Sequence, residues 1–90
     1  MVNKIVFTKL AQTIIRDLSP QSKAAIREAI DQLKTNPYLG KPLRDELVPY
    51  RSLRCNRHRI VYLIHEQKRE VIIAIVGQRH SIYETLKRLV

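Results

Sequence analysis

Tryptophan is absent from this sequence of 90 residues, and phenylalanine occurs once, as Phe7. The core must therefore be built from Ile, Leu and Val rather than from large aromatic side chains. The one cysteine, Cys55, has no partner in the chain, which excludes an internal disulfide and indicates a reducing compartment. The hydrophobic content of 44% is that of an ordinary globular protein and excludes a disordered chain.

Long apolar runs are also absent, and none approaches the length needed to span a bilayer. The first nine residues are interrupted by Asn3, Lys4 and Thr8, so they are too polar for the core of a signal peptide. We therefore expect a cytoplasmic protein with no membrane partner. Neither a repeat nor a linker is evident, and the length predicts a single domain over residues 1–90.

Acidic residues are scarce, because eight Asp and Glu accompany seventeen Lys and Arg and leave a net charge of +9. Five of the ten arginines lie between Arg44 and Arg59. Guanidinium groups suit bidentate contact with phosphate, and basic side chains gain affinity for nucleic acid by releasing its counterions. This clustering favours a polyanionic partner over a surface that is basic for solubility alone.

Hydrophobic spacing in the first half of the chain predicts a strand followed by two helices. Residues 2–7 alternate as in a strand, and helical spacing begins at Thr8. Ser19-Pro20 is typical of the start of a second helix, with Ser19 as its N-cap, and Asn36-Pro37 ends that helix. The following segment, residues 38–49, contains two of the four prolines and is expected to be a loop.

The second half predicts three strands at residues 50–55, 58–65 and 70–76. We expect Gly77 to end the last of these strands. Ser81 and Glu84 have the spacing of a capping box for a short C-terminal helix. The predicted fold is therefore α+β, in the order β-α-α-β-β-β-α, with a helical hairpin packed on a mostly antiparallel four-stranded sheet.

Asn56-Arg57 is the predicted turn between the first two of these strands. With that turn, Arg54 lies opposite Arg59 and Cys55 lies opposite His58. Two arginines in this arrangement repel each other and do not stabilise the fold. A phosphate held between them would form two charge-assisted contacts instead. The alternative, in which both arginines simply extend into solvent, stays open at this point.

The stretch from Gly77 to Tyr83 places an arginine, a histidine and a tyrosine near the start of the last helix. Free N–H groups at such a terminus favour an anion. Arg79 is suited to stabilising a developing negative charge, and Tyr83 to stacking on a base or taking part in proton transfer. Packing of Tyr83 against the sheet is an equally good interpretation.

Two stretches, Leu53 to Tyr62 and Val76 to Tyr83, together resemble the RelE/ParE toxin superfamily of type II toxin–antitoxin modules. They carry a Leu-Arg-turn-Arg-aliphatic-aliphatic-Tyr hairpin and a Gly-x-Arg…Tyr ending. The resemblance implies a microbial RNase-like fold and, for the RelE branch, cleavage of messenger RNA in the ribosomal A site. It also implies a cognate antitoxin that wraps the basic surface, and binding of operator DNA only by the toxin–antitoxin complex.

The same resemblance implies roles for individual residues. Arg59 and Arg79 correspond to phosphate-stabilising arginines and Tyr83 to a catalytic tyrosine. Apart from the resemblance, the chemistry of the side chains makes Tyr83, His80 and His58 the candidates for acid and base. The expected RNA-binding residues are Lys41, Arg44, Arg51, Arg54 and Arg57.

The chain departs from the family pattern at Ser52. The RelE branch often carries a basic residue there, so the identity of the general base stays open. Attack by the RNA's own 2′-OH on the adjacent phosphate requires no protein nucleophile, cofactor or metal ion. We expect no metal site, because His65 lies on the sheet face opposite His58 and four convergent ligands are not available.

Two other functions compete with an RNA-cleaving enzyme. A ParE-like inhibitor of DNA gyrase would have the same fold, although that branch generally lacks the catalytic set, and Arg79 with Tyr83 favours the nuclease. A non-catalytic nucleic-acid-binding module requires only the positive charge.

Overall fold

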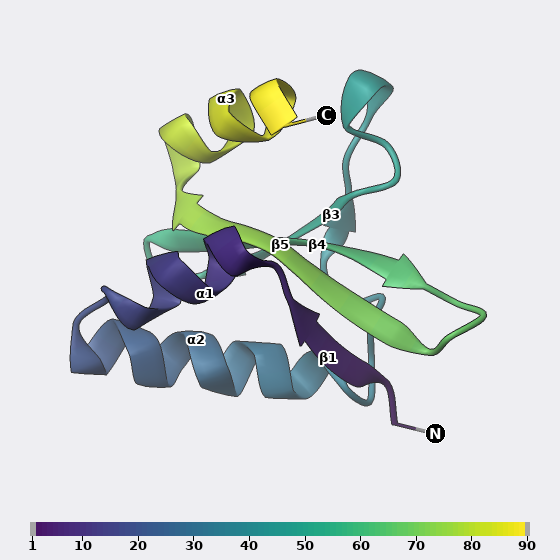
Figure 1. The fold of residues 1–90 in the computed structure, drawn as a ribbon, viewed down its shortest axis with the longest axis horizontal. Coiled ribbons are helices and arrows are strands. Elements are labelled where there is room, and N and C mark those ends of the chain that lie inside the picture. The colour runs from purple at the N-terminus through teal and green to yellow at the C-terminus, as the bar shows by residue number, and fades with distance from the viewer. Residues whose placement is uncertain (1, 90) are drawn as a thin grey trace.

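The computed structural model describes residues 2–89, except for the side chains of Arg79 and His80. Figure 1 shows the path of the chain through its helices and strands. The elements are β1 (Lys4–Phe7), α1 (Lys9–Arg16), α2 (Pro20–Leu33), β2 (Lys41–Pro42), the short 3-10 helix η1 (Asp45–Leu47), β3 (Arg51–Cys55), β4 (His58–His65), β5 (Glu70–Gln78) and α3 (Arg79–Leu89). The predicted order of helices and strands is confirmed, with β2 and η1 as additions.

The strands form one five-stranded sheet in the order β1-β5-β4-β3-β2. Only β1 and β5 run parallel, while the other neighbours are antiparallel. The α+β fold with a mostly antiparallel sheet is thus confirmed, and the two-residue β2 adds a fifth strand at one edge. β5 is an interior strand, as its apolar run predicts, and Ile75 and Val76 are buried on its two faces.

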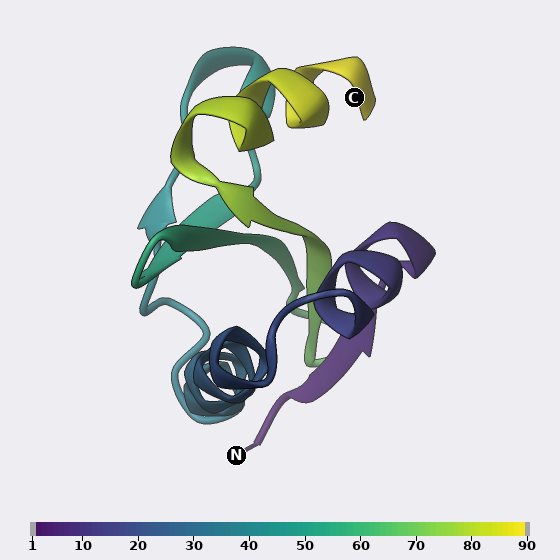
Figure 2. The same ribbon diagram turned by 90° about the vertical axis from the view of Figure 1, so that its left-hand side faces the viewer.

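Helices cover both faces of the sheet. Figure 2 shows α1 and α2 on one side and α3 on the other. The larger core cluster joins α1 and α2 to the sheet through residues such as Ile26, Leu33 and Tyr62, all fully buried. The smaller cluster places Ile82 and Leu86 of α3 against the opposite face. The β3–β4 hairpin therefore has α3 beside the face that carries its polar side chains.

Local capping explains where the first two helices begin. The Thr8 hydroxyl accepts a hydrogen bond from the N–H of Ala11, and the Ser19 hydroxyl accepts one from the N–H of Ser22. Pro20 occupies the first turn, where its missing N–H costs nothing. The predicted start of the second helix is confirmed. Within residues 2–89, no helix is both long and apolar enough to cross a membrane.

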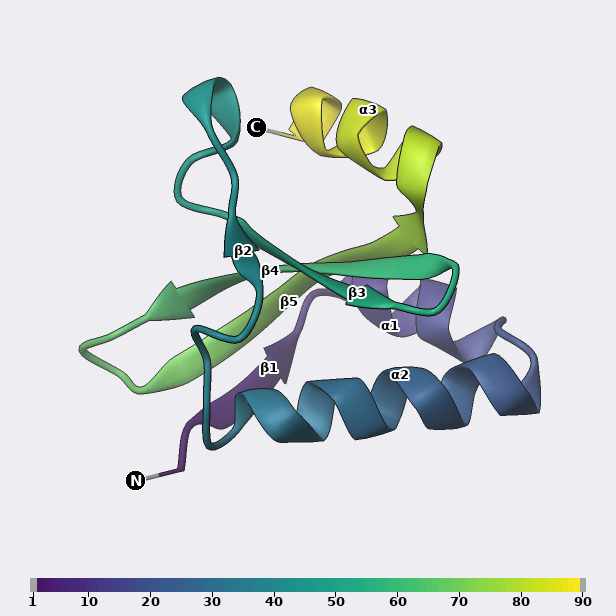
Figure 3. The same ribbon diagram turned by 180° about the vertical axis from the view of Figure 1, so that it is seen from behind.

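Three local predictions were wrong. The segment expected to be a loop contains β2 and η1, because Lys41 and Pro42 pair with the edge of β3 (Figure 3). β5 continues through Gly77, since Gly77 and Gln78 find pairing partners at the start of β4. α3 consequently begins at Arg79, so Ser81 is not its N-cap, and the Ser81 hydroxyl donates to the Gln78 carbonyl at 3.5 Å.

Candidate functional site

The β3–β4 hairpin has the register that its sequence predicts. Cys55 pairs with His58 and Arg54 with Arg59 across the two strands. Asn56 has a φ of 56°, a left-handed conformation that asparagine tolerates better than most residues, so the turn closes at the predicted position. The two arginines therefore share one face of the sheet. This pairing of like charges is the main electrostatic feature of the hairpin.

Next to this pair, three polar side chains meet at Ser52. The Tyr83 hydroxyl donates to the Ser52 Oγ at 3.2 Å, and Nη1 of Arg59 approaches the same oxygen at 3.5 Å. Ser52 is only 4% exposed, whereas Arg59 and Tyr83 are half-buried. Tyr83 thus reaches from α3 to the hairpin with its hydroxyl on the same face as Arg59. Its ring packs on the core cluster beneath α3, so both expected uses of Tyr83 are compatible.

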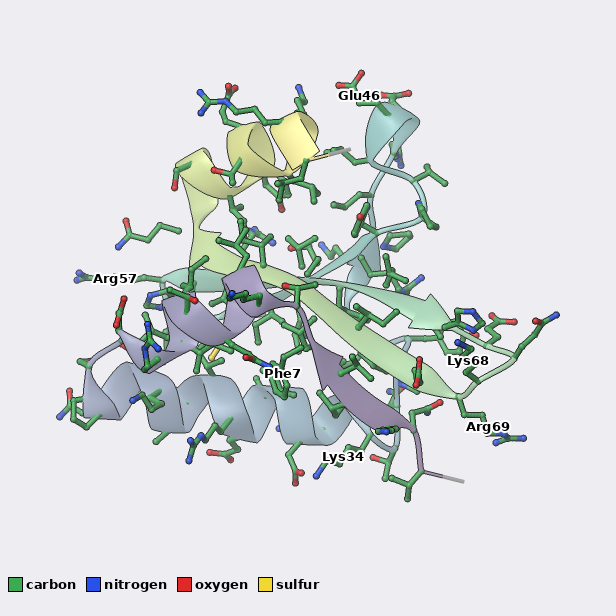
Figure 4. The ribbon with its side chains drawn as sticks, in the orientation of Figure 1. Phe7, Lys34, Glu46, Arg57, Lys68 and Arg69 are labelled. Carbon is green, nitrogen blue, oxygen red and sulfur yellow. The ribbon has the colours of Figure 1, made fainter. Side chains whose placement is uncertain are left out.

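The end of the hairpin is concave. A cavity of about 210 Å³ is lined by Arg54, Asn56, Arg57, His58 and Arg59. Three of these five side chains are guanidinium groups, which suits the cavity to a phosphate anion. Figure 4 shows Arg57 at the tip of this hairpin, at the opposite end of the molecule from Lys68 and Arg69. The three guanidinium groups of the cavity are therefore grouped around the turn between β3 and β4.

The other expected RNA-binding residues lie outside this cavity. Lys41 pairs with Ser52 from β2, so it shares the sheet face of the site, and it is exposed. Arg44 is exposed at the start of η1. Arg51 is held inside the fold, because its Nη2 donates to the Gly40 carbonyl at 2.6 Å and to the Tyr38 carbonyl at 3.2 Å. These contacts give Arg51 a structural function.

The side chains of Arg79 and His80 lie outside the described residues, so their expected roles stay predictions. Their backbone starts α3, directly after Gln78. Gly77 pairs with Arg59 across β4 and β5, so the chain enters α3 beside the arginine pair. The three atoms nearest to a Cβ on Gly77 would belong to Ile82, at ordinary contact distances of 3.5–3.6 Å. The backbone therefore brings the second predicted half of the site to the same end of the sheet.

The cysteine and histidines of the hairpin do not form a ligand cluster. Cys55 is half-buried, and burial raises the pKa of its thiol, with a smaller contribution from the Glu28 carboxylate. Among the side chains that the structure describes, no three His, Cys, Asp or Glu residues gather in a way that could hold a metal ion. Cys55 packs instead against the larger core cluster.

Ser52 is the site residue that the sequence did not identify as functional. Alternation along β3 places it on the same face as Arg54, and this part of its geometry could be read from the predicted hairpin. The burial of Ser52 could not be predicted from β3 alone, because it arises from the packing of β2 and α3 around this residue. The fold and this cluster define a class of protein: a small, basic α+β domain with an arginine-lined cavity suited to phosphate.

Comparison with known proteins places the chain within that class. Residues 5–83 match the family model described as the ParE toxin of type II toxin-antitoxin system, parDE. Toxin RelG of Mycobacterium tuberculosis is 37% identical over 79 residues, which cover 86% of this chain and 91% of RelG. The chain belongs to the RelE/ParE superfamily of toxins from type II toxin–antitoxin systems.

Solved structures agree with this assignment. The crystal structure of the RelBE2 toxin–antitoxin complex from Mycobacterium tuberculosis contains a chain that is 33% identical. Its TM-score is 0.81, over 88% of this chain and 100% of that one. A mutant of the RelE toxin of E. coli in the free state has a TM-score of 0.81 at 19% identity, over 100% of both chains, and supports the fold alone. The protein is therefore a toxin of a type II system, as the two sequence stretches implied.

Proposed function

We propose that this toxin is an endoribonuclease that cleaves messenger RNA by attack of a 2′-OH group on the adjacent phosphate. The observation that carries the proposal is the convergence of Arg59 and Tyr83 on Ser52, at 3.5 and 3.2 Å, beside Arg54. An arginine and a phenol on one sheet face supply a charge stabiliser and a group able to bind or transfer a proton.

Each group has a defined task in this reaction. Arg59 and Arg54 hold the scissile phosphate and stabilise the additional charge of the pentavalent transition state. Tyr83 orients or activates the 2′-OH. His58, which lines the cavity, is a candidate donor of a proton to the 5′ oxygen, which leaves as the P–O5′ bond breaks and a 2′,3′-cyclic phosphate forms. Arg79 contributes a further phosphate contact in this proposal, on the basis of the family pattern and of its backbone position after Gly77.

The ribosomal A site is the proposed place of cleavage. The cavity of about 210 Å³ offers three guanidinium groups to a phosphate, and in this proposal the rest of the RNA strand is oriented from outside the toxin. A ribosome would supply that orientation by holding the strand so that the 2′-OH lies in line with the P–O bond that breaks. The exposed Lys41 and Arg57 then contact the neighbouring backbone.

Mapping of messenger RNA 5′ ends in cells that express the toxin tests this function. We expect new ends within coding regions with the wild-type chain, and a loss of about 10²-fold or more with Arg59→Ala or Tyr83→Phe. Arg88→Ala removes an exposed arginine at the far end of α3 and serves as the matched control. Full cleavage by folded Arg59→Ala protein would contradict the proposal.

The gyrase alternative is retained because the matching family model carries the ParE description. It predicts inhibition of DNA supercoiling by purified toxin with no new messenger RNA ends. A non-catalytic module predicts RNA binding that weakens steeply with salt and no cleavage on translating ribosomes. The same preparation can be used in all three assays, so they separate the functions directly.

We also propose that an acidic segment of a cognate antitoxin occupies a groove of about 830 Å³ that lies between β1, α1 and α2. The groove has an apolar floor that includes Ile5, Ile15 and Ile30, and Asp31 is the one acidic residue among those that line it. Basic side chains surround that floor: Lys4, Arg16, Lys23, Arg27 and Lys34. The charge therefore complements an acidic, amphipathic partner segment.

A further inference from the structure

We infer that Ser52 is a positioning residue whose hydroxyl holds Tyr83 and Arg59 in one relative orientation toward the scissile phosphate. The inference rests on the proposed ribonuclease function and names a residue that the family pattern does not supply. Ser52 occupies the position at which a basic residue is expected in the RelE branch. A neutral hydroxyl there cannot replace the charge of a lysine, so its contribution must be of another kind.

The first supporting observation is the burial of Ser52. It is the one polar residue in the buried set of the described chain, at 4% exposure. A buried hydroxyl is unfavourable unless it is hydrogen-bonded, and the partners of this one are the two groups assigned to the chemistry. The hydrogen bonds that satisfy this buried hydroxyl are therefore the same contacts that orient Tyr83 and Arg59.

The second observation is that the backbone of Ser52 is fixed from both sides. Ser52 pairs with Lys41 of β2 and with Val61 of β4. Gly40 packs so closely on it that a Cβ on Gly40 would lie 2.8 Å from the Ser52 carbonyl oxygen. A side chain that projects from such a clamped backbone has little freedom, which is the requirement for a residue that orients others.

The third observation is that Gly40 is itself held by buried contacts. The Tyr62 hydroxyl accepts a hydrogen bond from the Gly40 N–H at 2.9 Å and donates to the Pro37 carbonyl at 2.7 Å. Nη2 of Arg51 donates to the Gly40 carbonyl at 2.6 Å. Arg51 and Tyr62 therefore support the position of Ser52 from the opposite face of the sheet, although neither reaches the cavity.

The chemistry of a hydroxyl suits this function better than an amine would. A serine oxygen can accept two hydrogen bonds and donate one. It therefore accepts from the Tyr83 phenol when that group is neutral, and it can donate to the same oxygen when the oxygen carries negative charge. Contact between the two residues is kept in both states, so Tyr83 does not rotate away from the RNA during proton transfer.

Single-turnover cleavage of messenger RNA on programmed ribosomes tests this inference, with Ser52→Ala, Ser52→Thr and Tyr83→Phe proteins. We expect Ser52→Ala to slow the step at saturating ribosome by about 10- to 100-fold, with apparent affinity for the ribosome changed less than about 2-fold. Ser52→Thr keeps a hydroxyl and should recover most of the rate. In the Tyr83→Phe background, Ser52→Ala should have a smaller effect than in the wild type, because only the contact with Arg59 then remains to be lost.

Ser22→Ala, on α2, is the matched control and should cleave like the wild type. A wild-type rate for Ser52→Ala would overturn the inference, as would full additivity of Ser52→Ala with Tyr83→Phe. Equal rates for folded Thr and Ala variants would do the same, because the hydroxyl would then be irrelevant.

A second measurement separates this inference from the proposed function. The ¹³C NMR shift of Tyr83 Cζ reports the hydrogen bond of the phenol without any need for RNA. We expect Ser52→Ala to move this signal and Ser22→Ala to leave it in place. An unmoved signal overturns the coupling between Ser52 and Tyr83. Absence of cleavage by the wild-type toxin, together with a moved signal, counts against the ribonuclease and leaves the coupling intact.

Discussion

At the residue scale, Gly40 is a position whose close packing affects both the fold and the candidate site. Its backbone does not have a positive φ, so the need for glycine comes from space rather than from conformation. A Cβ there would lie 2.7 Å from the Tyr62 hydroxyl oxygen and 2.8 Å from the Ser52 carbonyl oxygen. The second of these atoms belongs to the backbone of a paired strand and cannot move away without disturbing β3.

We therefore expect Gly40→Ala to lower the free energy of unfolding by about 1–3 kcal/mol, the usual cost of overpacking. Urea unfolding followed by circular dichroism measures the change. Gly77→Ala is the matched control, because the new methyl group would meet only Ile82, at 3.5 Å. It should not lower stability, since replacing glycine in a strand also reduces the freedom of the unfolded chain. Equal losses in the two variants would contradict this account.

At the element scale, the hairpin of β3 and β4 has the register that its local sequence predicts. Its Arg54–Arg59 pair is electrostatically unfavourable. The Arg54–Arg59 pair could be predicted because a two-residue turn at Asn56 fixes the register of both strands. β2 could not, because Lys41–Pro42 becomes a strand only through pairing with the distant residues of β3. The start of α3 was misplaced for a similar reason, since pairing with β4 extends β5 past Gly77.

The residues of the candidate site could likewise be predicted where they depend on local sequence, but not where they depend on contacts between distant segments. Arg59 could be assigned from the hairpin, and the family pattern added Tyr83. The interpretation of Arg51 as an RNA contact could not anticipate that the chain folds Gly40 against its guanidinium group. Nor could alternation alone indicate that Ser52 joins Arg59 to Tyr83, because α3 reaches the hairpin across thirty-one residues of sequence.

The repulsion in the hairpin yields a prediction with two readouts of opposite sign. Arg54→Gln removes one of two like charges on directly opposite positions, so stability should rise by about 0.2–1 kcal/mol. The same change should weaken RNA binding and reduce the slope of log affinity against log salt concentration by about 1. Thermal unfolding and filter binding at several salt concentrations measure the two effects.

Lys68→Gln is the matched control for this change. It removes an exposed positive charge at the opposite end of the molecule and should leave both stability and salt slope nearly unchanged. A less stable Arg54→Gln protein would show that the Arg54–Arg59 pair is not strained. An unchanged salt slope would show that Arg54 does not contact phosphate.

At the scale of the whole molecule, two separate surfaces gather positive charge. One is the hairpin cavity with its three arginines. The other is the groove between β1, α1 and α2, which is about four times larger. β1 lies at one end of the sheet order and pairs on one side only within the described chain, so its outer edge is open beside the groove. An extended partner segment could add to that edge while its acidic side chains meet the basic rim.

This separation predicts that antitoxin binding and RNA cleavage can be lost independently. Lys23→Glu combined with Arg27→Glu reverses two groove charges and should weaken binding of the cognate antitoxin at least about 10-fold, while cleavage persists. Arg59→Ala should lower cleavage while leaving the affinity for the antitoxin nearly unchanged. Calorimetry with the purified antitoxin and single-turnover cleavage measure the two properties, and Lys68→Glu controls for charge reversal elsewhere. Unchanged antitoxin affinity would exclude the groove as its docking site. Loss of cleavage in the folded groove variant, while Lys68→Glu cleaves normally, would instead assign the groove to RNA, because a general effect of reduced net charge would also slow the Lys68→Glu protein.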